Sequence, residues 1–135
     1  MRPGRGYTVT PAKLNYTFSP VVRSYASLGG NIVGQNFSAT LKTYTVSGLI
    51  TKSDTTTGIA SVAVTITSAT PAGFAPRTVQ TNLSGVYTVT GLPAGRTYVI
   101  KPLKTGFTFT PLTRTLTNLS GNVTAGSLTN FTGVQ

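Results

Sequence analysis

Alternation of apolar and polar residues marks several short strands along this chain. The clearest run is Ser61–Thr67, in which Val62, Val64 and Ile66 alternate with small or polar residues. Because successive side chains leave a strand on opposite faces, these three branched residues are predicted to face a core while Ser and Thr face water. The pattern therefore predicts a half-buried strand. No stretch shows a helical period of comparable quality.

Two more alternating runs lie on either side of a turn at residues 91–95. The turn reads Gly-Leu-Pro-Ala-Gly, in which the glycines supply backbone freedom and the proline fixes one dihedral angle. A polar, glycine-containing loop at residues 82–85 has the chemistry of a hairpin connection. This stretch is predicted to form successive strands whose core-facing residues are Tyr87, Val89, Leu92, Tyr98 and Ile100.

A longer motif runs from Thr81 to Pro111. It reads Thr-Asn-x-x-Gly-x-Tyr-x-Val-x-Gly-Leu-x-x-Gly-x-x-Tyr-x-Ile, and then Lys-x-Gly-Phe-x-Phe-x-Pro from Lys104 onward. The motif is similar to that of carboxypeptidase-regulatory-like and collagen-adhesin B-type modules, and the similarity covers residues 43–135. It implies an all-β, seven-stranded antiparallel Ig-like (prealbumin-like) sandwich of a kind usually strung in tandem on secreted bacterial proteins. Such modules serve as stalks, spacers, adhesin segments and enzyme appendages, so the resemblance implies little about function.

Residues 4–34 repeat residues 95–125 at a constant offset of 91 positions. Of the 31 aligned positions, 12 are identical. After a three-residue insertion the match resumes, with Asn-Phe-Ser from Asn36 aligned on Asn-Phe-Thr from Asn130. Self-similarity of this kind indicates an internal repeat.

The repeat divides the chain into residues 1–42, the C-terminal half of a module, and residues 43–135, a complete module. A half sandwich exposes sheet edges and an apolar face, and it is marginally stable alone. Three explanations stay open: a window of a longer tandem array, a subunit completed by strands of a neighbouring chain, or a layer that covers the complete module. Each requires contacts beyond residue 42. The residues expected to make the assembly contact are Tyr7, Val9, Tyr16, Phe18, Tyr25, Leu28 and Phe37.

The composition removes the groups that most catalytic sites need. The chain has a single acidic residue, Asp54, and contains neither His nor Cys. Neither a carboxylate pair nor a His-activated nucleophile can be assembled, and a calcium site needs several carboxylates. We therefore expect no enzymatic activity, no cofactor and no metal. No apolar run is long enough to predict a membrane span.

The formal net charge of +10 raises the question of anionic partners. The basic residues are scattered without a run, and Tyr and Phe are predicted to lie in the core rather than between basic residues, where they could stack on bases. We therefore expect no specific nucleic-acid partner. Glycans and an anionic cell surface remain candidates.

These observations predict a non-enzymatic structural repeat of an extracellular bacterial or archaeal surface protein or filament. It is expected to assemble through β-strand complementation with adjacent repeats or with other copies of the chain. The alternative is an adhesin module that binds glycans or an anionic surface. A further alternative is an accessory domain attached to an enzyme.

Six Asn-x-Ser/Thr patterns are candidate glycosylation acceptors in a secreted protein. They begin at Asn15, Asn36, Asn82, Asn118, Asn122 and Asn130.

Overall fold

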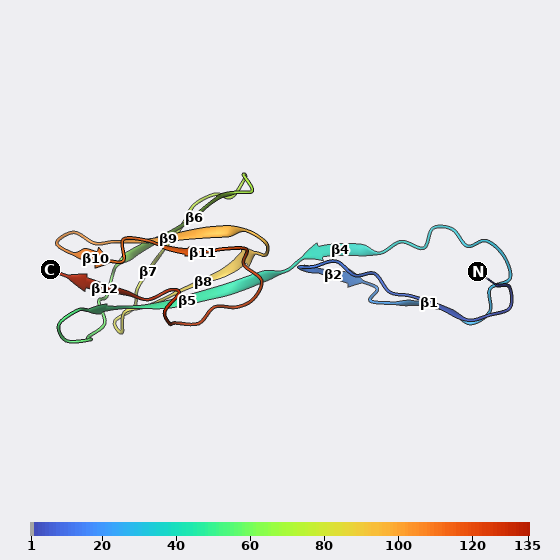
Figure 1. Ribbon diagram of the computed structural model, residues 1–135, viewed down its shortest axis with the longest axis horizontal. Coiled ribbons are helices and arrows are strands. Elements are labelled where there is room, and N and C mark those ends of the chain that lie inside the picture. The colour runs from blue at the N-terminus through green and yellow to red at the C-terminus, as the bar shows by residue number, and fades with distance from the viewer. Residues whose placement is uncertain (1) are drawn as a thin grey trace. The chain divides into compact units, whose positions relative to one another are not determined.

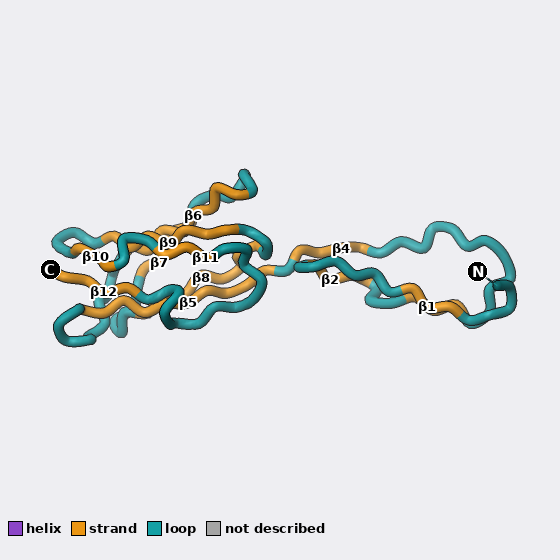
Figure 2. The backbone as a smooth tube through the Cα atoms, in the orientation of Figure 1, coloured by secondary structure: helices purple, strands orange, loops and turns teal. Residues whose placement is uncertain are grey.

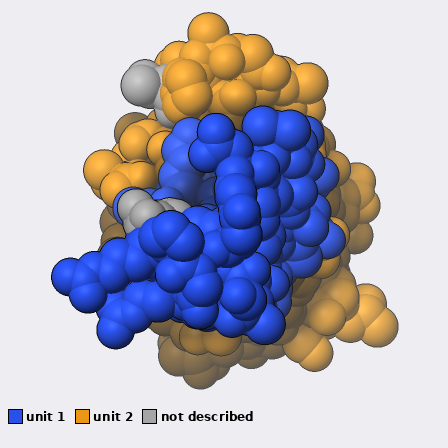
Figure 3. Space-filling model, turned by 90° about the vertical axis from the view of Figure 1, so that its right-hand side faces the viewer, with its two compact units in different colours: residues 1–42 blue, residues 43–135 orange. Residues whose placement is uncertain are grey.

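The computed structural model describes residues 2–135, apart from the side chain of Thr70. Its regular elements are all β-strands, separated by loops and turns (Figure 2). The chain divides into two compact units, Met1–Lys42 (unit 1) and Thr43–Gln135 (unit 2), which are coloured separately in Figure 3.

Unit 2 is a sandwich of two four-stranded sheets (Figure 1). The first sheet has the order β10-β12-β5-β8, with β5 at Thr43–Lys52, β8 at Val86–Pro93, β10 at Thr108–Thr110 and β12 at Phe131–Val134. The second has the order β11-β9-β6-β7, with β6 at Ala63–Thr70, β7 at Arg77–Gln80, β9 at Thr97–Leu103 and β11 at Arg114–Leu116. The predicted all-β, Ig-like sandwich is confirmed.

One strand pair of unit 2 departs from the antiparallel arrangement that the sequence predicts. β12 pairs with β5 in parallel, placing Phe131 opposite Ile50 and Gly133 opposite Lys52. Parallel neighbours need a long connection, and here the whole of β6–β11 lies between the two strands in the sequence. The sandwich also has eight strands, one more than the seven implied by the resemblance.

The core of unit 2 lies between the two sheets. Val64 and Ile66 of β6 are buried, and so is Val62, which lies directly before β6. This agrees with the alternation of residues 61–67. The tyrosines Tyr87 and Tyr98 are also buried in the same cluster. The residues that the alternating runs predict for the core, Val62, Val64, Ile66, Tyr87, Val89, Leu92, Tyr98 and Ile100, are all buried. Phe107, from the later part of the motif, is half-buried and packs against the cluster.

Two threonines of unit 2 are buried as well. Thr81 Oγ1 donates a hydrogen bond to Ile59 O at 2.6 Å and accepts one from Val62 N at 2.9 Å. Thr129 is fully buried, and its Oγ1 lies 3.4 Å from Thr124 O. Their hydroxyl groups therefore have partners inside the protein, which offsets the cost of removing them from water.

Unit 1 consists of two two-stranded antiparallel sheets (Figure 1). β1 (Tyr7–Val9) pairs with β3 (Arg23–Tyr25), and β2 (Tyr16–Ser19) pairs with β4 (Ser38–Leu41). None of its described residues, 2–42, is buried. Unit 1 thus has paired strands but no core of its own.

Gly48 in β5 faces the ring of Tyr87 on β8, its partner across the ladder. A Cβ atom at position 48 would lie 2.3 Å from Cζ and Oη of that ring. The ring has little room to yield, because Tyr87 is buried and its hydroxyl donates to Thr129 O at 2.6 Å.

We therefore expect Gly48→Ala to lower the free energy of unfolding of unit 2 by about 1–3 kcal/mol, the usual cost of overpacking. Urea unfolding of the full chain measures the change. Gly121→Ala is the matched control, since a Cβ there meets no atom within 4 Å, and it should shift stability by less than about 0.5 kcal/mol. Equal stability of the two variants would contradict the steric argument.

Candidate assembly surface on unit 1

The strand pairing of unit 1 repeats that of the second half of unit 2. Tyr7 lies opposite Tyr25 in the β1–β3 pair, and Tyr98 lies opposite Leu116 in the β9–β11 pair, each 91 positions further along. In the other sheet the pairs are Phe18 with Ala39 in unit 1 and Phe109 with Gly133 in unit 2. The first member is again shifted by 91 positions, and the second by 94 because of the insertion. Each ladder of unit 1 therefore has the same register as its equivalent in unit 2.

The turns and side-chain contacts are repeated too. Tyr7 Oη donates to Arg2 O at 2.9 Å, and Tyr98 Oη donates to Pro93 O at 2.7 Å. Main-chain contacts match in the same way: Gly4 N to Leu28 O at 2.8 Å, and Gly95 N to Leu119 O at 2.7 Å. The guanidinium contacts also match: Arg23 Nε to Asn36 O at 3.3 Å, and Arg114 Nε to Asn130 O at 3.0 Å. Residues 2–42 thus repeat the strand pairing and turn contacts of the second half of unit 2.

The two copies differ in what covers their apolar side chains. Val9 is 39% exposed, whereas its equivalent Ile100 is 1% exposed. Tyr7 and Leu28 are half-buried, and their equivalents Tyr98 and Leu119 lie in the core. The same second half is therefore closed in unit 2 and open in unit 1.

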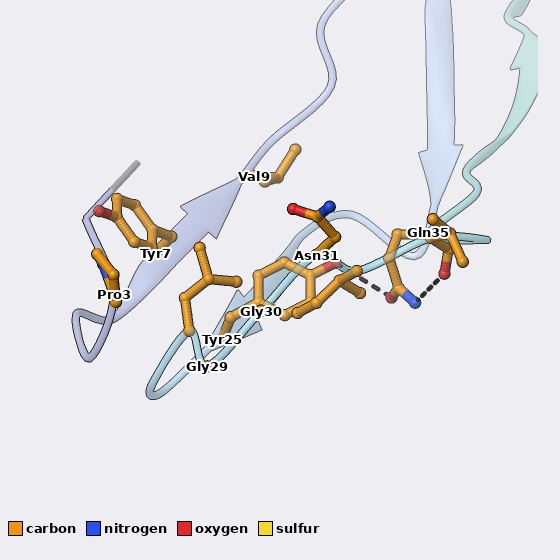
Figure 4. A pocket seen from close by; sticks show the side chains of 11 residues that line it. Pro3, Tyr7, Val9, Tyr25, Gly29, Gly30, Asn31 and Gln35 are labelled. Atoms are coloured by element: carbon orange, nitrogen blue, oxygen red, sulfur yellow. Dashed lines mark hydrogen bonds between the residues drawn. The ribbon is translucent and has the colours of Figure 1, made fainter.

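An open hollow of about 740 Å³ lies on this uncovered face (Figure 4). Four of the seven residues predicted for the assembly contact line it: Tyr7, Val9, Tyr25 and Leu28. Sequence reasoning missed Pro3, Ile32, Val33 and Gln35, which also line it. Ile32 lies 91 positions before Val123, so the repeat itself carried a signal for that residue.

The other three predicted residues belong to the β2–β4 sheet or lie beside it. Tyr16 and Phe18 are on β2, and Phe37 directly precedes β4; all three are half-buried. They do not line the hollow. Phe109, the equivalent of Phe18, and Phe131, the equivalent of Phe37, are buried in unit 2. The seven residues that were predicted as one assembly contact are therefore divided between the two sheets of unit 1.

Unit 2 shows how such a second half is joined to a first half. Two asparagine side chains accept main-chain hydrogen bonds from β5: Asn122 Oδ1 from Thr45 N at 2.9 Å, and Asn130 Oδ1 from Leu49 N at 2.9 Å. Asn130 Oδ1 also accepts from Gly126 N at 3.0 Å. These contacts fix β5 against the second half, and the equivalent positions in unit 1 are Asn31 and Asn36.

Burial raises the pKa of Tyr87 above its ordinary value of 10.0, although the hydrogen bond to Thr129 O and the charge of Arg114 act in the opposite direction. Burial likewise raises the pKa of Tyr98, against the charges of Arg96 and Arg77. Both hydroxyls are therefore neutral donors at physiological pH. They act as structural groups in the closed module.

Several cations also serve the fold. Arg77 Nη1 donates to Thr90 O at 2.8 Å, and its guanidinium lies 5.4 Å from the ring centre of Phe74. Arg96 approaches the same ring from 5.9 Å and bonds to Pro71 O. Lys104 Nζ donates to Ala60 O at 2.6 Å. In a chain with a single acidic residue, these cations contact carbonyl oxygens and aromatic rings instead of carboxylates.

Three of the candidate glycosylation acceptors have a structural use. Besides Asn122 and Asn130, Asn82 Oδ1 accepts from Ser84 N at 2.9 Å and Val86 N at 3.0 Å, which shapes the loop between β7 and β8. Because β7 and β8 belong to different sheets, this loop is not the hairpin connection that the sequence predicts. Asn15, Asn36 and Asn118 complete the set, and Asn15 and Asn118 have positive φ angles of 68° and 51°. Modification at the six sites stays a prediction.

Catalytic and metal-ligating groups are not brought together in the described residues. Asp54, the single acid of the chain, lies in the exposed loop after β5. Within residues 2–135, no group of three His, Cys, Asp or Glu residues could hold a metal ion. No helix in this part of the chain has the length and apolar character to span a membrane.

Comparison with known proteins supports the fold and leaves the function open. No family model matches the chain. It is 34% identical over 129 residues to chitinase ChiA of Flavobacterium johnsoniae, a match that covers 96% of this chain and 7% of that protein. The chain thus spans a small part of this curated relative.

Two solved structures are similar to this chain. The Bacillus anthracis TIE protein matches with a TM-score of 0.53 at 9% identity, over 84% of this chain and 19% of that one. The minor pilin of Streptococcus agalactiae matches with a TM-score of 0.52 at 16% identity, over 99% of this chain and 62% of that one. At these identities the likeness concerns the fold alone. It agrees with the sandwich fold implied by the resemblance to collagen-adhesin B-type modules.

The hydrogen bond from Tyr87 to Thr129 O joins the two halves of unit 2, and we expect Tyr87→Phe to cost about 0.5–1.5 kcal/mol of stability. The raised pKa adds a dependence on pH. The unfolded state releases the tyrosine proton near pH 10 while the folded state keeps it, so stability is constant below that pH and falls above it. Urea unfolding between about pH 8 and pH 11 should show a shallower fall for Tyr87→Phe, with Tyr98 supplying the remainder. The same slope in both proteins would refute the assignment.

The two asparagines at equivalent positions allow a matched pair of variants. Asn130→Ala leaves Leu49 N and Gly126 N without their acceptor, so we expect unit 2 to lose about 1–3 kcal/mol. Asn36→Ala lies in unit 1 and should leave the unfolding of unit 2 unchanged. Urea unfolding of both variants measures the difference. A loss of similar size for Asn36→Ala would show that unit 2 does not depend on Asn130 in particular.

Proposed function

We propose that this chain is a non-catalytic structural repeat of an extracellular surface protein or filament, and that it assembles by β-strand complementation. The carrying observation is the repetition of one half-module structure in two states, closed in unit 2 and open in unit 1. A surface that is buried in one copy and exposed in the other is an association surface. The module itself extends or displays whatever it is joined to.

The nature of the contacts supports a mechanical role. The two halves of unit 2 are held by main-chain ladders, asparagine side chains and one apolar core. Such contacts require correct shape and strand order but no reactive group. The minor pilin of Streptococcus agalactiae, which is similar to this chain in fold, is in keeping with the proposal.

The same proposal extends to a repeat within a larger enzyme. The chain matches 7% of the length of chitinase ChiA, and a segment of that size leaves ample room for a catalytic domain elsewhere. In that setting the repeat would space or present the catalytic domain, and it would take no part in the hydrolysis.

The rival function is recognition of a glycan or an anionic surface, which the net charge of +10 favours. The structure offers another use for part of this charge. Arg23, Arg77, Arg96, Lys104 and Arg114 all donate to main-chain carbonyl groups. Side chains engaged in this way are less available to a ligand.

Binding assays separate the two functions. The purified chain is passed over heparin and chitin columns and applied to a glycan array at about 0.15 M salt, where the attraction between exposed charges is largely screened. We expect no selective retention and no release of sugar from chitin oligomers. An unrelated protein of similar positive charge serves as control. Retention on one glycan that exceeds this control, or hydrolysis, would overturn the structural proposal.

A further inference from the structure

The open face of unit 1 lacks the strands that cover its equivalent in unit 2. In unit 2, β12 has β10 on one side and β5 on the other, and β9 lies between β11 and β6. In unit 1, β4 pairs with β2 alone and β1 pairs with β3 alone. Each of these two strands therefore presents one row of main-chain groups that its counterpart in unit 2 uses for pairing.

We propose that this face is the docking site for the first half of a module of the same type, joined covalently ahead of Arg2. The occupant is a segment with the strand order and apolar pattern of residues 43–92. The inference rests on the proposed structural function and specifies its partner. Docking would convert unit 1 into a second closed sandwich.

The ladders of unit 2 specify the register of the docked strands. There, Ile66 of β6 lies opposite Ile100, and Ile50 of β5 lies opposite Phe131. Transferred to unit 1, the β6-like strand places its equivalent of Ile66 opposite Val9, and the β5-like strand places its equivalent of Ile50 opposite Phe37. The first pair is antiparallel and the second parallel.

The hollow has the chemistry to receive those strands. Its residues Tyr7, Val9 and Leu28 have equivalents that share one core cluster with Val62, Val64 and Ile66. A β6-like strand directs its alternate side chains into this space, because residues two apart lie on one face. Insertion would remove the exposed apolar surface of unit 1 from water, which is the main favourable term.

Asn31 and Asn36 supply the polar part of the site. Their equivalents Asn122 and Asn130 accept hydrogen bonds from main-chain N–H groups of β5. The main-chain oxygen of Asn36 accepts a hydrogen bond from Arg23 Nε, and that of Asn130 accepts one from Arg114 Nε. The main chain at Asn36 therefore matches that at Asn130. The side-chain amides of Asn31 and Asn36 are therefore assigned to a docked β5-like strand.

Two observations favour a covalently preceding segment over a second copy of the chain. First, Arg2 O accepts a hydrogen bond from the hydroxyl of Tyr7. In the same way Pro93 O, at the end of β8, accepts one from the hydroxyl of Tyr98. A segment ending in a β8-like strand therefore enters unit 1 at the correct point. The strands of unit 2, in contrast, are already paired within their own sandwich, so a second copy would have to open its core to donate them.

The join between the units shows the same succession of halves. One residue, Lys42, separates β4, the last strand of one second half, from β5, the first strand of the next first half. Modules of this kind can thus follow one another without a linker. In a chain of such modules, first and second halves would alternate, and each second half would be covered by the first half that precedes it.

An extended chain tests the proposal, with residues 43–92 fused ahead of residues 2–135 so that Leu92 is followed by Arg2. Amide hydrogen exchange is compared between this protein and the 135-residue chain. We expect the amides of β1 and β4 to become at least about a hundredfold better protected, approaching those of β9 and β12. Unit 2 is present in both proteins and serves as an internal reference for folding.

Two variants of the extended chain sharpen the result. Val64→Asp in the added segment should abolish the gain in protection while leaving unit 2 intact. Asn36→Ala, expected to be silent in the 135-residue chain, should now destabilise the new module as Asn130→Ala destabilises unit 2.

Unchanged exchange of β1 and β4 in the extended chain, with unit 2 folded, would overturn the proposal. Dimers of the 135-residue chain with β1 and β4 already protected would overturn it as well, because the occupant would then be a second copy. In both cases a failure of the underlying function remains distinguishable, since that would appear as selective glycan retention or hydrolysis.

Discussion

Main-chain pairing between the two halves of a module is the interaction on which the rest of this structure depends. β12 and β9 are central strands of their sheets in unit 2 because β5 and β6, from the first half, lie on their second edges. Buried main-chain groups need partners, and an apolar sheet face needs cover. Where the first half is present, both needs are met and a core forms. In unit 1 the same second half keeps its local pairing but has no buried residue in its described part.

This contrast separates local from long-range determinants of the fold. The strand pairs, the turn contacts and the arginine contact to the asparagine carbonyl group form in unit 1 without a core. They are therefore set by the sequence of the half module itself. Burial of Tyr98 or Ile100, in contrast, depends on strands from residues 43–92. The local structure of unit 1 therefore matches that of its equivalent in unit 2 even without covering strands.

Much of the fold could be predicted from the sequence because its signals are local. Period-two alternation located β6 and the buried residues Val62, Val64 and Ile66, and the constant offset of 91 positions revealed the internal repeat. The parallel pairing of β12 with β5 could not be obtained in this way, since alternation is the same for either strand direction. The burial of Thr81 and Thr129 was also missed: Thr suits an exposed strand, and only the tertiary structure shows the partners of their hydroxyl groups.

The candidate site was predictable to a similar degree. Aromatic and aliphatic residues of unit 1 were identified by their repeat partners, but their division between two sheets depends on strand pairing over long separations. The role proposed for Asn31 and Asn36 could not be predicted from the sequence, for a different reason. Their equivalents act through side-chain oxygens that accept main-chain hydrogen bonds, and a sequence pattern shows the residue but not the N–H group that faces it.

The same physical basis explains how the fold persists while sequences diverge. Ladder bonds use atoms that every residue except proline supplies, and an apolar seam tolerates exchanges among residues of similar volume. Solved structures with 9% and 16% identity can therefore share this sandwich. The match to chitinase ChiA, at 34% identity, covers 96% of this chain and so includes both the half module and the complete one.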